Sequence, residues 1–271
     1  MKPQPWKVPA DRRRLVLEAL RERGQVLAAE LAQQFGCSDD TIRRDLDRLA
    51  EEGRIQRVHG GALIRHDDVP SFGARRDQQS ASRSAVAAAA AGLVRNGSVV
   101  VLDGGTTCLA LARQLRPDLK ATIFTPSPTA AEALTAYPGV RVELVGGQLR
   151  ADTMTAFGPR ALHTLASVRP DLCVLAPCGL HPEVGLTVAE LEDRELKATM
   201  LTNAVETIAL ARSDKVGTVL PFVVGPVDAV TRIVVDDQTP EQQLVAYRRL
   251  GVEVVIARTG LSLSTSQAGV G

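Results

Sequence analysis

The sequence predicts an α/β protein in two parts: a small N-terminal domain of helices closed by a β-hairpin, and a larger C-terminal α/β domain with a mostly parallel sheet. Two observations lead to this prediction. The first 66 residues contain two helical patterns, a glycine turn, a third helical pattern, and then two short apolar runs around a Gly-Gly turn. Beyond about residue 82, continuous apolar runs alternate with helical patterns, which is typical of a parallel sheet covered on both faces.

The composition is that of an ordinary soluble protein, with 45% hydrophobic and 23% charged residues. Residues 1–66 carry 13 Lys/Arg against 10 Asp/Glu, net +3, whereas residues 67–271 carry 19 against 21, net −2. A mildly basic front suits a nucleic-acid-binding module. The N-terminus lacks the apolar core of a signal peptide, and the longest apolar run, Ala85–Val94, is about half of the ~20 residues that span a bilayer. We therefore expect a cytoplasmic protein.

The cysteines predict neither a metal site nor a disulfide framework. Cys37, Cys108, Cys173 and Cys178 are scattered, with no CxxC pair, and the four histidines do not supply the missing ligands. We interpret the cysteines as buried or incidental thiols in a reducing compartment, and we expect no cofactor.

Three helices are predicted in the N-terminal domain. The first covers 11–23, with Gly24 closing it, and the second covers 26–35. After a turn at Gly36-Cys37, the third covers Ser38–Leu49, where Ile42, Leu46 and Leu49 share one face and Ser38 is the N-cap. This layout is a helix-turn-helix, in which the start of the third helix meets base edges and phosphates in the major groove. Taken alone, the third helix also fits an ordinary amphipathic helix with a solvated charged face.

A β-hairpin follows the third helix. Arg54–Val58 and Ala62–Ile64 are predicted strands around His59-Gly60-Gly61, forming the wing of a winged helix. Near its tip, Arg57 and His59 are expected over DNA phosphates or the minor groove, although His59 alone fits a plain turn residue.

These residues strongly resemble the DeoR family of bacterial transcriptional regulators. The resemblance is carried by Glu30-Leu31-Ala32, Phe35-Gly36, the run TIRRDL at 41–46, Leu49, Gly53, and the run R-x-HGGA at 57–62. It implies that the third helix reads double-stranded operator DNA through Ser38, Thr41, Arg43 and Arg44. Asp45 is acidic, and we expect it to orient an arginine rather than to touch DNA.

The C-terminal domain is predicted to begin after a polar linker. We assign 11–66 to the DNA-binding domain, 67–82 to the linker, 83–258 to the α/β domain and 259–271 to a disordered tail. Predicted strands are 98–103, 121–125, 140–145, 171–176, 207–211, 231–235 and 252–257. Predicted helices are 83–96, 106–115, 128–136, 187–203 and 241–250.

A ligand site is predicted where the first strand of this domain ends. Asp103-Gly104-Gly105-Thr106-Thr107 leads from the strand into a helix, and ligands of open α/β sheets bind at such carboxyl ends. The glycines allow close approach and the helix N-terminus favours anions, so the turn fits a phosphate cradle. Asp103 would accept from a sugar hydroxyl or brace the loop. A tight turn with a threonine cap explains the pattern equally well.

The DeoR resemblance extends over this domain, to about residue 257. It matches Asp103-x-Gly105-Thr106-Thr107, Gly146-Gly147-Gln148-Leu149, Gly158, Gly185-Leu186-Thr187 and Ser213-x-Lys215-x-Gly217, with Arg83 where the family usually has lysine. It implies a fold similar to ribose-5-phosphate isomerase, a phosphorylated sugar or related metabolite as effector, and Arg83, Gly147 and Lys215 as further effector contacts. Pro126, Pro177 and Arg212 depart from the family pattern.

The sequence thus predicts a repressor of a carbohydrate operon, released by its effector and at least dimeric on its operator. We expect no enzymatic activity. The alternatives are a sugar-phosphate isomerase-like enzyme with an appended DNA-binding module, for which Asp103 is the candidate general base, and a constitutive DNA-binding protein with a degenerate sensor.

Overall fold

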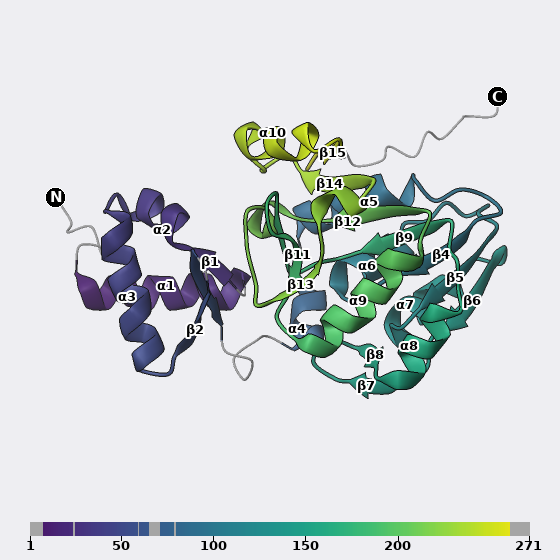
Figure 1. Ribbon diagram of the computed structural model, residues 1–271, viewed down its shortest axis with the longest axis horizontal. Helices are drawn as coiled ribbons and strands as arrows, with labels where there is room; N and C mark the ends of the chain where they lie inside the picture. Colours follow the sequence, from purple (N-terminus) through teal and green to yellow (C-terminus); the bar gives the residue numbers. More distant parts are fainter. Residues whose placement is uncertain (1–7, 24, 59, 65–70, 79, 261–271) are drawn as a thin grey trace, which may run out of the picture.

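The structure is a computed structural model that describes residues 8–23, 25–58, 60–64, 71–78 and 80–260 (Figure 1). It confirms the predicted fold class. The N-terminal domain contains α1 (Pro9–Arg23), β1 (Gln25–Leu27), α2 (Ala28–Phe35), α3 (Asp39–Glu51), β2 (Ile55–Val58) and β3 (Gly61–Ile64). The predicted hydrophobic face of α3 is confirmed, because Ile42, Leu46 and Leu49 are at most 2% exposed and pack with α1 and α2. Each such buried side chain contributes roughly 1.5–3 kcal/mol.

The start predicted for the second helix is wrong. Val26 and Leu27 lie in β1, which pairs antiparallel with β3 in a three-stranded sheet of order β1-β3-β2. A Cβ at Gly61 would lie 2.0 Å from the Val26 carbonyl oxygen, so glycine is what permits this close pairing. The wing therefore gains a third strand at the expense of two residues of helix.

The predicted linker also contains regular structure. Within 67–82 the structure describes a short helix, α4 (Phe72–Asp77), and the first residues of α5 (Ala81–Ala91). Ser71 caps α4 by accepting from the N–H of Ala74 at 3.2 Å, and Phe72 is only 3% exposed. A helix of six residues is too short to show a helical repeat in the sequence. Residues 65–70 and 79, and 261–271 of the predicted tail, lie outside the described residues.

The C-terminal domain is built on a seven-stranded sheet in which all neighbouring strands are parallel, as predicted. The order is β15-β14-β12-β9-β4-β5-β6. The strands are β4 (Val99–Leu102), β5 (Ala121–Thr125), β6 (Val140–Leu144), β9 (Leu172–Leu175), β12 (Glu206–Leu210), β14 (Arg232–Asp236) and β15 (Glu253–Ala257).

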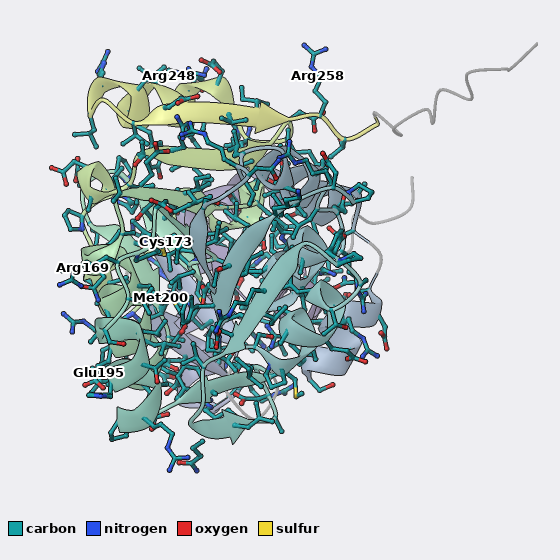
Figure 2. The ribbon with its side chains drawn as sticks, turned by 90° about the vertical axis from the view of Figure 1, so that its right-hand side faces the viewer. Arg169, Cys173, Glu195, Met200, Arg248 and Arg258 are labelled. Atoms are coloured by element: carbon teal, nitrogen blue, oxygen red, sulfur yellow. The ribbon has the colours of Figure 1, made fainter. Side chains whose placement is uncertain are left out.

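Helices cover both faces of this sheet. One face packs against α5, α6 (Thr106–Ala112) and α7 (Pro128–Leu134), and the other against α8 (Pro159–Ala166), α9 (Leu191–Asn203) and α10 (Glu241–Arg249). Successive strand residues alternate between the two cores: Cys173 and Leu175 face α9, whereas Leu172 and Val174 face α5. Cys173 and Met200, labelled in Figure 2, belong to one buried cluster, whereas Arg248 and Arg258 project outward.

Several short strands were not predicted. They are β7 (Gln148–Arg150) paired with β8 (Thr155–Phe157), and a small antiparallel sheet of β10 (Gly179–His181), β11 (Gly185–Val188) and β13 (Phe222–Gly225). Two short 3₁₀ turns, η3 (Ser213–Lys215) and η4 (Val227–Ala229), complete the described elements. The helix predicted from Thr187 begins instead at Leu191, because Thr187 belongs to β11. A Cβ at Gly185, whose φ is +102°, would lie 2.1 Å from the Gly225 carbonyl oxygen, so glycine allows β11 to meet β13.

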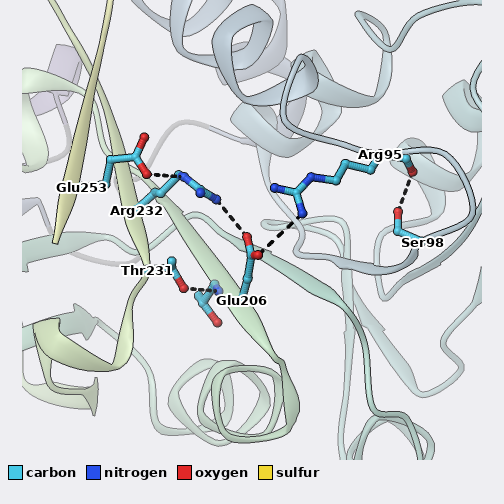
Figure 3. Close-up of polar contacts among 7 residues, drawn as sticks. Arg95, Ser98, Glu206, Thr231, Arg232 and Glu253 are labelled. Carbon is cyan, nitrogen blue, oxygen red and sulfur yellow. Dashed lines mark hydrogen bonds and ion pairs between the residues drawn. The ribbon is translucent and has the colours of Figure 1, made fainter.

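The amino-terminal ends of β12, β14 and β15 are joined by ion pairs. Arg232 at the start of β14 contacts Glu206 of β12 at 2.9 Å and Glu253 of β15 at 2.6 Å, and Arg95 reaches Glu206 at 3.7 Å (Figure 3). This end of the sheet is thereby held together by charge, opposite the end where a ligand is expected. In the part of the chain that the structure describes, no helix is long and apolar enough to cross a membrane.

Candidate DNA and effector sites

The start of α3 is organised by its cap. The Ser38 hydroxyl accepts from the Thr41 N–H at 3.2 Å and lies 2.8 Å from the Thr41 hydroxyl, which confirms Ser38 as the N-cap. Both side chains predicted to touch DNA here are therefore also hydrogen-bonded to each other. Their cap fixes the direction in which α3 leaves the turn.

Arg43 and Arg44 are exposed on the surface of α3. Arg43 pairs with Asp39 at 2.8 Å and Arg44 with Asp40 at 2.5 Å, each one helical turn earlier, and their side chains are 60% and 79% exposed. Exposed pairs of this kind contribute only about 0.2–1 kcal/mol, so phosphates can replace the aspartates at little cost.

Asp45 faces the opposite way. It is 5% exposed and accepts from the Arg12 guanidinium at 2.5 Å, with Arg13 at 3.7 Å, so it ties α3 to α1. The prediction that Asp45 orients an arginine is confirmed, and its partner is Arg12.

Arg57 links the wing to α3. Its Nε donates to Asp47 at 2.8 Å and its Nη1 donates to the Gly61 carbonyl. A DNA contact from Arg57 therefore requires sharing its guanidinium with Asp47. His59, also predicted at the wing, lies outside the described residues.

At the carboxyl end of β4, Asp103 is fully buried. Its carboxylate accepts from the N–H groups of Gly104 at 2.7 Å and Ala176 at 3.0 Å, and from Lys197 of α9 at 2.9 Å. Burial raises the pKa of Asp103, and Lys197 and the hydrogen bonds oppose that rise. In this arrangement Asp103 braces the turn, joining β4, β9 and α9.

Lys197 was not predicted. It is 5% exposed and contacts Asp193, one turn earlier in α9, at 2.6 Å. Burial by itself lowers the pKa of Lys197, but the carboxylates of Asp103 and Asp193 outweigh burial and raise it, so Lys197 is a buried cation. The i,i+4 spacing of Asp193 and Lys197 was the available signal, and by itself it indicates a surface pair.

Gly104 and Gly105 of the predicted cradle are glycines for different structural reasons. A Cβ at Gly104 would lie 2.1 Å from the Thr155 hydroxyl, so Gly104 allows β8 to approach. Gly105 has φ +92°, which favours glycine, and has no atom near its missing Cβ. Thr106 and Thr107 open α6 beside it and are half-buried. The turn is therefore partly exposed at Gly105, whereas Gly104 is buried.

At Gly147 the glycine is required by a contact within the protein. A Cβ there would lie 2.4 Å from the Phe157 carbonyl oxygen, and φ is +147°. The approach of β8 therefore explains this glycine without a ligand. Its role in effector binding stays a prediction.

The cations predicted to bind the effector lie at strand ends and on α5. Arg83 is 9% exposed and donates to the Gln78 carbonyl at 3.1 Å. Its pKa is lowered first by burial and then by the charges of Arg212 and Arg75. Lys215 in η3 is half-buried, 3.7 Å from Asp214, which also contacts Arg212 at 2.8 Å. Arg212, a departure from the family pattern, therefore adds positive charge beside Arg83.

All four cysteines are free, and burial raises the pKa of the Cys108 and Cys173 thiols well above its ordinary value. Within the described residues there is no cluster of His, Cys, Asp or Glu able to hold a metal ion.

An exposed recognition helix with a wing, joined to an α/β domain with cations at its strand ends, defines a two-domain DNA-binding regulator. Residues 12–68 match the DeoR-like helix-turn-helix domain and residues 78–237 match the DeoR C terminal sensor domain. The sensor match alone covers more than half of the 271 residues, so the chain belongs to the DeoR family of transcriptional regulators.

Two relatives extend over most of the chain. A putative aga operon transcriptional repressor of Escherichia coli O157:H7 is 30% identical over 251 residues, 91% of this chain and 93% of that protein. The HTH-type transcriptional regulator GlpR of Haloferax volcanii is 31% identical over 212 residues, 78% of this chain and 83% of that protein. Among solved structures, ribose 5-phosphate isomerase A from Methanocaldococcus jannaschii matches 49% of this chain and 52% of its own, at 18% identity and a TM-score of 0.35, which says nothing of function.

Proposed function

We propose that the protein is a repressor that binds operator DNA through α3 and the wing, and that a phosphorylated sugar or related metabolite releases it by binding at the carboxyl ends of the sheet strands. The observation that carries this proposal is the joining, in one chain, of exposed arginines at the start of α3 to a second domain where Arg83 and Lys215 lie near strand ends. Relatives named as a putative aga operon transcriptional repressor and a glycerol-3-phosphate regulon repressor support it.

The proposed DNA surface consists of the exposed residues at the start of α3 and the wing. Arg43 and Arg44 are free to exchange their aspartate partners for phosphates or base edges. We propose that Arg57 and His59 contact the DNA backbone beside these two arginines. A single winged helix has modest specificity, so we propose that the protein acts as a homodimer or larger oligomer on a repeated or palindromic operator.

The proposed effector contacts are Arg83, Asp103, Gly104, Gly105, Thr106, Thr107, Gly147 and Lys215. Arg83 and Lys215 supply charge for a phosphate dianion, and Thr106 and Thr107 supply hydroxyl donors. Asp103 supports the turn on which they stand. We propose that effector-bound and effector-free forms differ in DNA affinity because the effector binds one form more tightly.

The contacts of Asp103 also argue against catalysis by this domain. Its carboxylate accepts from two backbone N–H groups and Lys197, and its side chain has no exposed surface. A general base needs a lone pair directed at the substrate, and this carboxylate is already engaged. We therefore propose a sensor without isomerase activity.

The test is fluorescence anisotropy of the full-length protein on its own upstream DNA, with a shuffled duplex as control. Binding at least a hundredfold tighter to the upstream DNA is expected of a regulator. Equal affinity for both duplexes contradicts it. A parallel assay with aldose and ketose phosphates tests the enzyme alternative, and measurable turnover would overturn the assignment of a sensor.

A further inference from the structure

Three arginines from separate parts of the chain meet in the sensor domain. Arg75 lies in α4, Arg83 in α5, and Arg212 directly before η3. Arg83 donates to the carbonyl of Gln78 at the end of α4, and Ser82 and Ser213, the sequence neighbours of Arg83 and Arg212, both contact Asp236. Burial lowers the pKa of Arg83, and the charges of Arg212 and Arg75 lower it further. The helix α4 also packs against α6, whose first residues are Thr106 and Thr107. The helices that carry Arg75 and Arg83 therefore both pack against the helix that the predicted cradle opens.

Asp236 contacts the sequence neighbours of two of these arginines. It is fully buried at the end of β14, and its Oδ2 accepts from both the Ser82 hydroxyl and the Ser213 N–H, the latter at 2.9 Å. Ser82 precedes Arg83, and Ser213 follows Arg212. One carboxylate oxygen thus joins the sequence neighbours of both arginines, the Ser82 side chain and the Ser213 backbone, without an ion pair to either arginine among the described residues.

The guanidinium of Arg83 is buried with few partners. Arg83 forms no ion pair within the described residues, and its guanidinium, with five N–H donors, donates to one carbonyl oxygen although the residue is 9% exposed. Asp214 is shared between Arg212 and Lys215. Arginine stays protonated in proteins, so the repulsion persists until an anion arrives.

We propose that Arg75, Arg83 and Arg212 together bind the phosphate group of the effector, and that α4, which carries Arg75, transmits the binding of this phosphate to the DNA-binding domain. The fork of donors on each guanidinium suits phosphate oxygens. Arg75 is held by the Asp152 carbonyl at 2.6 Å, and α4 is the first element described after β3 of the wing. A phosphate that binds Arg75 therefore acts on the segment that leads to the DNA-binding domain. This inference rests on the proposed function.

The test uses inorganic phosphate as the probe, titrated calorimetrically into the full-length protein at constant ionic strength. Arg75→Gln, Arg83→Gln and Arg212→Gln are each expected to weaken phosphate binding at least tenfold. Arg76→Gln is the matched control, because Arg76 is the next residue of α4 and pairs with Asp77 on the surface. It is expected to change the phosphate Kd less than twofold.

The outcomes separate this inference from the proposed function. Loss of binding in Arg83→Gln with no change in Arg75→Gln would overturn the role of α4 and leave a smaller phosphate site. An absence of phosphate binding by the wild type up to about 50 mM would overturn the site itself. Where Arg83→Gln fails to fold, the variants of the half-buried Arg75 test the site. Arg75→Lys is expected to have a phosphate Kd between those of the wild type and Arg75→Gln. Operator affinity measured without phosphate on the same samples tests the proposed function independently.

Discussion

At the scale of single residues, both domains depend on a buried carboxylate that holds a cation from another element. Asp45 joins α3 to Arg12 of α1, and Asp103 joins β4 to Lys197 of α9. Removing one partner leaves an uncompensated buried charge, which typically costs 3–5 kcal/mol. These pairs therefore decide whether each domain presents its surface at all.

Lys197→Met tests the pair in the sensor domain. We expect the free energy of unfolding to fall by about 3–5 kcal/mol, because Asp103 remains buried with its cation gone. Asp103→Asn combined with Lys197→Met is expected to lose less than the sum of the single changes. Urea denaturation followed by circular dichroism measures both, and a loss below about 1 kcal/mol in Lys197→Met would contradict the stabilising role of this pair.

Arg44→Ala tests the reading surface. If Arg44 contacts a base, operator binding is expected to weaken by roughly 1–3 kcal/mol. Arg14→Ala is the control, because Arg14 is likewise exposed and paired one turn away, with Glu18 of α1. Anisotropy on the upstream DNA measures both variants. An Arg44→Ala protein that binds as the wild type does would remove Arg44 from the DNA surface.

At the scale of elements, α4 is expected to couple the two domains. Phe72→Ala removes the buried anchor of α4, and a buried Phe→Ala change typically costs 3–5 kcal/mol when the whole domain depends on it. We expect operator affinity without effector to stay within about twofold, because α4 lies outside the DNA-binding domain. Release by effector is expected to need at least tenfold more effector. An unchanged effector response in anisotropy titrations would refute the coupling role.

The elements that the sequence could predict are those with a repeated pattern. Most of the seven sheet strands contain apolar runs, β6 alternates apolar and charged residues, and α3 has apolar residues at helical spacing, so these elements were predicted. The short pieces were missed. Val26-Leu27 continues a helical spacing, but these two residues pair with β3. Thr187 lies two residues after Gly185, where the close approach of Gly225 requires a glycine. In both cases a contact distant in sequence outweighed the local preference.

The candidate site shows the same division. The turn from Asp103 to Thr107 was visible because a strand leads directly into it. Lys197 and Asp236 were not visible, because each acts through residues far away in the chain: 94 positions separate Lys197 from Asp103, and 154 separate Asp236 from Ser82. A long-range polar contact leaves no period in the sequence.

At the scale of the whole molecule, the two ends of the sheet have separate roles. The amino ends are joined by Arg232 and its glutamates, whereas the carboxyl ends carry the cations proposed for the effector. Arg232→Gln is expected to cost about 1 kcal/mol of stability, since its pairs are partly exposed. The effector concentration that releases this variant from DNA should match that of the wild type. A shifted effector response in this variant would contradict the separation of roles.

The central claim is that a phosphorylated metabolite bound to the sensor domain releases α3 from DNA. The most direct measurement is anisotropy of the protein bound to its own upstream DNA, titrated with a panel of sugars and their phosphates. Release by a phosphorylated sugar, with no release by its unphosphorylated parent, is the predicted result. Equal release by sugar and sugar phosphate, or tight binding that every compound leaves unchanged, would contradict it.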